Sequence, residues 1–257
     1  MRGLLLFFLL SLNGCAIWVI TPNPRVESPE LRGDRGLKIG GDVGGAHAYN
    51  AVPDGSTRPP TMNQPDMDRT VDTNASFLYS PTEPLEFGIE AHPFSAGLSA
   101  IVKWQPVGEG TRTAKEGNVP LGFYLRAGSV YSQASGDQKD LFGSGGYPWK
   151  GTINGNYVHA GFSVGYRPAE HALVYIGAAA GQYWNRIEVD QNAANGDTGG
   201  VYKASDTGFA RTGGAGVVFN WHIVQFYVGG DYSYIRYTHA GAIDSLFFHG
   251  GFYFTPR

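Results

Sequence analysis

The stretch NYVHAGFSVGYR, residues 156–167, decides the fold class of this chain. From Val158 to Tyr166 every second residue is apolar, and the residues between are histidine, serine or glycine. A period of two residues is typical of a β-strand with one apolar and one polar face. The same alternation returns in VPLGFYLRAGSVY (119–131), HIVQFYVGGDYSY (222–234) and EPLEFGIEAH (83–92). The chain is therefore expected to be all-β.

Ten segments carry this signal, and most have the length of a tilted membrane crossing, about 9 to 13 residues. Short connections such as 80–83, 167–171 and 220–222 alternate with long polar ones at 50–70, 133–154 and 186–205, as in outer-membrane barrels. The sequence predicts an antiparallel transmembrane β-barrel of ten strands over residues 37–257, or of eight if 92–95 is a kink. The expected strands are 37–49, 71–80, 83–92, 96–105, 120–132, 155–167, 172–185, 206–220, 222–236 and 243–254.

Composition narrows the class of protein. The 257 residues include one cysteine and 38 glycines, 14% are aromatic, and the net charge of −3 offers no basic surface for nucleic acid. Aromatic residues fall near predicted strand ends, where rings suit the boundary between water and hydrocarbon. A soluble barrel of lipocalin type stays the alternative. The aromatic residues are Tyr49, Tyr79, Trp104, Tyr131, Tyr166, Trp184, Trp221 and Tyr234.

The N-terminus predicts export. An arginine precedes the apolar run Leu4–Leu10, and Leu12-Asn13-Gly14-Cys15 follows. This end resembles the bacterial lipoprotein signal with its lipobox, which implies a signal peptide over 1–14, a lipid on Cys15, and outer-membrane delivery by the lipoprotein-sorting machinery. An ordinary signal peptide or helical anchor is the alternative. Residues 15–36, rich in proline and charge, are expected to form the lipidated N-terminus and an extended linker.

Charged residues recur at the strand positions that alternate with the apolar ones. If the apolar residues face outward, these charged residues face the lumen. Both signs occur in similar number, and a small barrel is filled by its own side chains, so the charges are expected to pair as a plug; a narrow channel or transporter is the alternative. His92, His159 and His249 are expected to belong to the same filling. The predicted lumen charges are Lys38, Asp42, Glu86, Glu90, Lys103, Arg126, Arg167 and Asp231.

The C-terminal part carries two further resemblances. IDSLFFHGGFYF, 243–254, resembles the aromatic C-terminal signal read by the barrel-assembly machinery, and YTHAGAIDSLFF, 237–248, resembles the last segment of lipid A deacylase barrels. His239 matches the base of those enzymes, but Gly241 stands at the nucleophile position and Ser245 lies six residues beyond the histidine. A lipid-modifying enzyme is therefore an alternative only.

The expected function is that of a plugged lipoprotein barrel in the bacterial outer membrane, with a structural, adhesive or interaction role through its external loops. The expected partners are outer-membrane lipids and the assembly and sorting machineries; the sequence does not identify a ligand for the loops. Neither a metal site nor a cofactor is expected, and the loop 190–200 is interpreted as a turn-rich loop rather than a calcium site.

Overall fold

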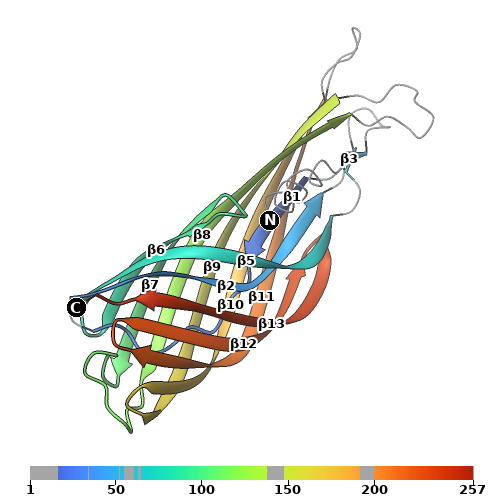
Figure 1. Cartoon of the computed structure of the whole chain (residues 1–257). Helices are drawn as coiled ribbons and strands as arrows, with labels where there is room; N and C mark the ends of the chain where they lie inside the picture. The colour runs from blue at the N-terminus through green and yellow to red at the C-terminus, as the bar shows by residue number, and fades with distance from the viewer. Residues whose placement is uncertain are drawn as a thin grey trace, which may run out of the picture.

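Ten antiparallel strands close into a barrel in the computed structural model of the chain (Figure 1). The ring runs β2-β13-β12-β11-β10-β9-β8-β7-β6-β5, and pairing of β5 with β2 completes it. The structure describes residues 17–33, 35–51, 53–54, 61–62, 65–137, 148–191 and 200–256. The ring strands are β2 (Gly36–Ala51), β5 (Asp66–Thr82), β6 (Leu85–His92), β7 (Gly97–Val107), β8 (Leu121–Asp137), β9 (Pro148–Ala169), β10 (Ala172–Gln191), β11 (Gly200–Trp221), β12 (Val224–Tyr237) and β13 (Gly241–Phe254).

The predicted all-β antiparallel barrel is confirmed, and each of the ten predicted strands overlaps one strand of the ring. The eight-strand alternative is wrong because a turn separates β6 from β7. There the Ser95 amide donates to the His92 carbonyl at 3.2 Å, and Ala96 has a φ of 45°. β3 (Pro53–Asp54) and β4 (Thr61–Met62) form a second, two-stranded sheet. In the described part of the chain, no helix is long and apolar enough to cross a membrane.

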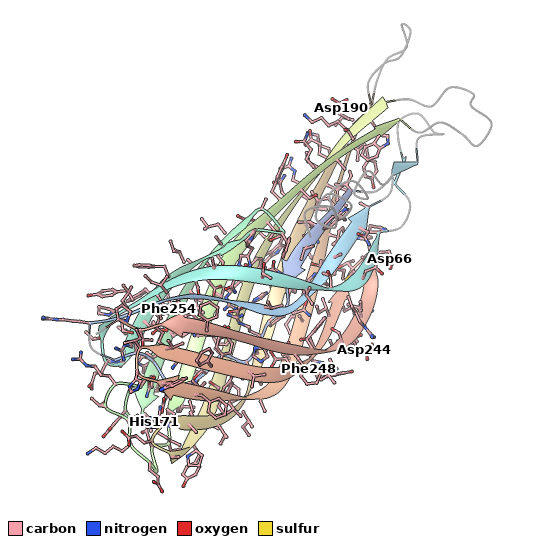
Figure 2. All side chains as sticks on the ribbon, in the orientation of Figure 1. Asp66, His171, Asp190, Asp244, Phe248 and Phe254 are labelled. Atoms are coloured by element: carbon pink, nitrogen blue, oxygen red, sulfur yellow. The ribbon has the colours of Figure 1, made fainter. Side chains whose placement is uncertain are left out.

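The two ends of the barrel differ. One end, here called the short-turn end, carries the connections 82–85, 169–172 and 221–224 and the end of β13; the opposite, long-loop end carries 51–66, 137–148 and 191–200. Figure 2 shows His171 and Phe254 toward the first end and Asp190 at the second. The predicted alternation of short and long connections holds only in part, since 92–97 and 237–241 are short and 107–121 is long.

The outer surface is apolar around the ring. On β9, Phe162 is 49% exposed and its outward neighbours Val164 and Tyr166 are exposed, whereas the inward Ser163 and Arg167 are buried. The predicted parity of the strands therefore describes the structure over this part of the barrel. The predicted boundary aromatics lie on the outside with one exception: Tyr49 is wholly buried inside and donates to Asp206 at 3.0 Å.

Near the long-loop end the pattern inverts. Trp149 and Ile153 of β9 are buried inside, while Lys150 and Asn154, each the next residue along the strand, face out and are exposed. β9, β10 and β11 continue in this way beyond the predicted strands, with 22, 20 and 22 residues. The outward residues of these extensions are polar, so the extensions have the composition of loops. For this reason the sequence predicted loops over 133–154 and 186–205, although parts of both ranges are strands.

The N-terminal part of the described chain runs through the barrel. β1 (Ile17–Pro22) pairs antiparallel with β2, from Ile17 opposite Ala51 to Pro22 opposite Ala46. The chain then continues to the short-turn end, where the Arg32 guanidinium donates at 3.3 Å to the carbonyls of Thr255 and Pro256. The Gly36 amide donates to the Gly33 carbonyl at 3.1 Å, and β2 begins at Gly36. We call Ile17–Gly33 the lumenal segment.

The prediction of an extended linker over 15–36 is therefore corrected in its described part. The segment is extended, as its prolines require, but its residues are mostly buried among inward-facing side chains rather than spanning solvent. An extended chain without regular pairing fits a lumen whose wall offers polar side chains to its backbone. The expected signal peptide 1–14 and the lipid site Cys15 lie outside the described residues.

Candidate functional site

The lumenal segment fills the barrel in layers, and the layer at the long-loop end is apolar. Ile17 and Val19 of β1 pack in one buried cluster with inward residues that include Tyr49, Ile153 and Ile187. The inverted parity of β9 and β10 builds this core, because it turns their apolar residues toward β1. Its residues are withdrawn from water as in a soluble domain.

A layer of tyrosine and histidine lies next to this apolar core, on the side of the short-turn end. The Tyr183 hydroxyl donates to the Pro22 carbonyl at 3.2 Å. His47 uses both ring nitrogens, with Nδ1 at 2.9 Å from Asn23 Oδ1 and Nε2 at 2.9 Å from the Tyr237 hydroxyl. The imidazole thus links the segment to the wall of the barrel.

Replacing Tyr237 with phenylalanine should lower the free energy of unfolding by about 1–3 kcal/mol, because the buried His47 nitrogen loses its partner. Tyr232→Phe on the same strand is the matched control, since that hydroxyl donates to Asp244 at 3.2 Å on the exposed outer face. Equal urea midpoints for the two variants in detergent micelles would contradict the role given to the His47 bond.

Glu27 is the centre of the charged layer. Its carboxylate lies 2.7 Å from Lys103 Nζ and 2.5 Å from Arg126 Nη2, and Arg25 Nε lies 2.7 Å away. The Ser163 hydroxyl also donates to the Glu27 carbonyl at 2.6 Å. One carboxylate of the segment therefore pairs with two cations that lie side by side on the paired strands β7 and β8.

Arg25 makes the reciprocal contact. Its guanidinium pairs with Asp42 of β2 and lies 3.5 Å from Glu90 Oε1 of β6, while Glu90 lies 2.7 Å from Arg126. The Tyr227 hydroxyl donates to Asp42 as well. The side chains of Asp42, Glu90 and Arg126 are nearly inaccessible to solvent and that of Arg25 is 11% exposed, and a buried charge is stable only when it is paired.

The lowest layer closes the short-turn end. Arg167 Nε donates to Glu30 Oε1 at 3.0 Å, and Asn118 Nδ2 donates to the same oxygen at 3.1 Å. The Leu31 amide donates to Gln105 Oε1 at 2.8 Å. Segment, wall and the long connection 107–121 are thus held together at this mouth.

The structure places all eight predicted lumen charges inside the barrel, each buried. Lys38 pairs with Glu86 at 3.2 Å, and Asp231 accepts from the Val26 amide at 3.3 Å. Arg126 meets Glu90, another of the predicted charges, whereas Arg167 pairs with Glu30 of the lumenal segment, which was not among them. Parity could place these residues; it could not reveal the partners that the lumenal segment supplies, namely Arg25, Glu27 and Glu30.

The three predicted histidines also face the interior, but they are dispersed. His92 Nδ1 lies 2.5 Å from Asp72, His249 Nε2 lies 3.6 Å from Asp231, and the His159 ring stacks on Tyr157. Across the described ranges, no group of three or more potential metal ligands of His, Cys, Asp or Glu type is found.

His239 meets an acid that sequence reasoning missed. Its Nδ1 lies 3.2 Å from Asp206, and its side chain is 63% exposed at the long-loop end. Ser245 is buried on the inward face of β13, opposite Ser233 in register. The pair has the base and acid of an acyl-transfer site, while Gly241, at the nucleophile position, supplies no oxygen.

Comparison with known proteins finds similarity to solved structures only. No protein-family model matches it, and no curated protein matches it. Among solved structures it is similar to Ail, the attachment invasion locus protein of Yersinia pestis, in complex with the heparin analogue sucrose octasulfate. That match has 12% identity and a TM-score of 0.34, and it covers 86% of this chain and 99% of that one. A second Ail structure matches with 13% identity and a TM-score of 0.30, covering 88% and 100%. The fold assignment therefore rests on the strand pairing described above.

Proposed function

We propose that the protein is a bacterial outer-membrane β-barrel lipoprotein that is closed along its lumen by its own N-terminal segment. Its role is structural, adhesive or interactive, exercised at the long-loop end, rather than transport. The observation that carries the proposal is the lumenal segment, which contacts the barrel wall from one end to the other. The lipid on Cys15 belongs to the proposal through its lipobox resemblance.

The outer face supports the membrane placement. A girdle of exposed apolar and aromatic side chains around a ring with a charged interior is the pattern of a barrel in lipid. In a water-soluble barrel such a surface would far exceed the apolar patches that monomers expose. Among the exposed members are Phe77, Phe87, Val102, Leu125, Phe162, Ile176, Phe219, Val228 and Phe248.

The extensions of β9, β10 and β11 support the external role. Barrels of this type keep short turns on the periplasmic side and longer loops outside, which directs the long-loop end to the exterior. There the strands are polar on the outside and apolar inside, so they can stand in water beyond the membrane. In Figure 2 Asp190 lies beyond Asp66 and Asp244 along the barrel, so this side forms a raised wall.

The remaining space argues against a channel. A cavity between residues 25–30 of the segment and the wall, bordered by Lys38, Lys103 and Tyr227, has a volume of about 20 Å³. That is about the room for a single water molecule. At this level of the lumen, a solute could pass only if the lumenal segment left its place.

Conductance in planar bilayers tests the closed lumen. The full-length protein should pass no steady current, whereas a variant lacking residues 17–32 should conduct, with heat-modifiable migration on a gel verifying that it folds. A steady ion-selective current through the full-length protein would refute the closed lumen and favour the channel alternative, whatever the deletion variant does.

A further inference from the structure

A groove opens on the outer face of the barrel across β10, β11 and β12. It has a volume of about 640 Å³, and its lining includes Gln182, Thr207, Phe209, Arg211, Tyr234 and Arg236. All six belong to the outward parity of their strands. The groove thus combines two guanidinium groups with hydroxyl and amide donors, and it lies outside the lumen described above.

The position of the groove along the barrel axis follows from β11. Trp221, 69% exposed, ends this strand at the short-turn end, and Arg211 lies ten residues before it. Ten residues at about 3.3 Å each, tilted by about 40°, rise about 25 Å, the height of the apolar band of such barrels. Arg211 therefore lies at the boundary where the headgroups of the long-loop-side leaflet begin, and a long arginine side chain can reach them.

The charge of the groove is not neutralised by the protein. In the described part of the chain, neither Arg211 nor Arg236 takes part in an ion pair, and the Arg211 guanidinium lies over the Tyr234 ring at 5.2 Å, which orients it. The outward acid beside them, Asp244, lies opposite Tyr234 in register and pairs with Arg69 at 3.4 Å. A phosphate matches such a pair of guanidinium groups in charge and in donor geometry.

Apolar surface continues from the groove toward the middle of the barrel. Tyr232 and Leu246, opposite each other in register and nearer the short-turn end than Arg211, are exposed on the same outer face, while Phe209 lines the groove opposite Arg236. Phe248 is 77% exposed, and Figure 2 shows it on β13 together with Asp244. A ligand with a phosphate at one end and hydrocarbon chains at the other satisfies both surfaces at once, whereas a free phosphate would use only the first.

We propose that this groove binds the phosphate headgroup of an anionic lipid in the leaflet on the long-loop side, with its acyl chains along the apolar face of β11 to β13. The proposal rests on the membrane placement in the proposed function and is independent of the closed lumen. A channel current would therefore refute the closed lumen, whereas a loss of lipid preference would refute this lipid site.

Native mass spectrometry of the full-length protein in mixed micelles tests the site. The probes are phosphatidic acid and phosphatidylcholine with identical acyl chains. The wild type should retain phosphatidic acid with a preference of about tenfold or more, Arg211→Gln and Arg236→Gln should each lower it by up to about tenfold, and the double variant should abolish it. Lys203→Gln is the matched control, because it removes an exposed outward cation from the same strand.

Equal retention of the two lipids by the wild type would overturn the proposal, and so would an equal loss in Lys203→Gln. Displacement of phosphatidic acid by an excess of inorganic phosphate would also overturn it, since it would indicate a site for soluble phosphate. Arg236→Lys, which keeps the charge, should retain most of the preference if attraction to the headgroup is the cause. The two measurements on the wild type, the lipid preference and the competition by inorganic phosphate, decide the proposal even if a variant fails to fold.

Discussion

Glu27→Ala should lower the free energy of unfolding by about 3–5 kcal/mol, and by less if water fills the space. The carboxylate of Glu27 lies 2.7 Å from Lys103 Nζ. Within the described chain it is the ion-pair partner on which Lys103 depends, whereas Arg126 and Arg25 keep Glu90. The substitution therefore removes the ion pair of one buried ammonium group beside two guanidinium groups and leaves Glu86, its neighbour in strand register, as the remaining acid. Urea titration of the folded protein in micelles measures the loss.

Glu188→Ala is the matched control for this prediction. It removes the same carboxylate from a lysine pair of similar length, 3.1 Å to Lys203, but there the side chains are 43% and 55% exposed. An exposed pair contributes about 0–1 kcal/mol. Adding Lys103→Met to Glu27→Ala should restore part of the stability, because it removes the stranded charge. A Glu27→Ala variant as stable as Glu188→Ala would contradict the buried network.

Phe162→Arg should destabilise the inserted barrel by about 2–4 kcal/mol, because it puts a charge on the lipid-facing side of β9 near the middle of the apolar band. Thr152→Arg is the comparison. It faces outward on the same strand ten residues nearer the long-loop end, opposite Glu188 in register, and should change stability little. Refolding into phospholipid vesicles, followed by heat-modifiable migration, gives both values. Equal losses would mean that the apolar band extends to Thr152.

Strict alternation made the ring predictable. Where the outer face is apolar and the inner face polar, as from Val158 to Arg167, one parity stays apolar along the strand, so the existence and facing of the strand could be predicted from sequence. The extensions of β9 could not, because the environment changes along the strand: from Trp149 to Tyr157 the apolar residues face inward and the polar ones outward. Periodicity continued, but its phase reversed, and the polar residues were interpreted as loop.

The lumenal segment was beyond prediction for a different reason. Pro22, Pro24 and Pro29 interrupt any period, and a proline-rich, charged stretch is more often a spacer than a core element. The structural role of Glu27 depends on Lys103 and on residues further along the chain. No local sequence pattern connects Glu27 with them. Parity placed the wall charges in the lumen, but only the fold shows that several of their counter-charges, Arg25, Glu27 and Glu30, come from outside the ring.

The shared edge of β2 has a consequence for the order of assembly. β13 pairs with β2 over five residues only, Gly250–Phe254 opposite Ile39–Val43, and β1 takes the same edge over Ala46–Ala51. β1 and β2 are close neighbours in sequence, whereas the seam with β13 joins residues some 200 positions apart, and distant contacts form late because closing a long loop costs more entropy. The N-terminal strand pair should therefore form before the seam. The barrel would then close around a segment already in place, without passing through an empty-barrel intermediate.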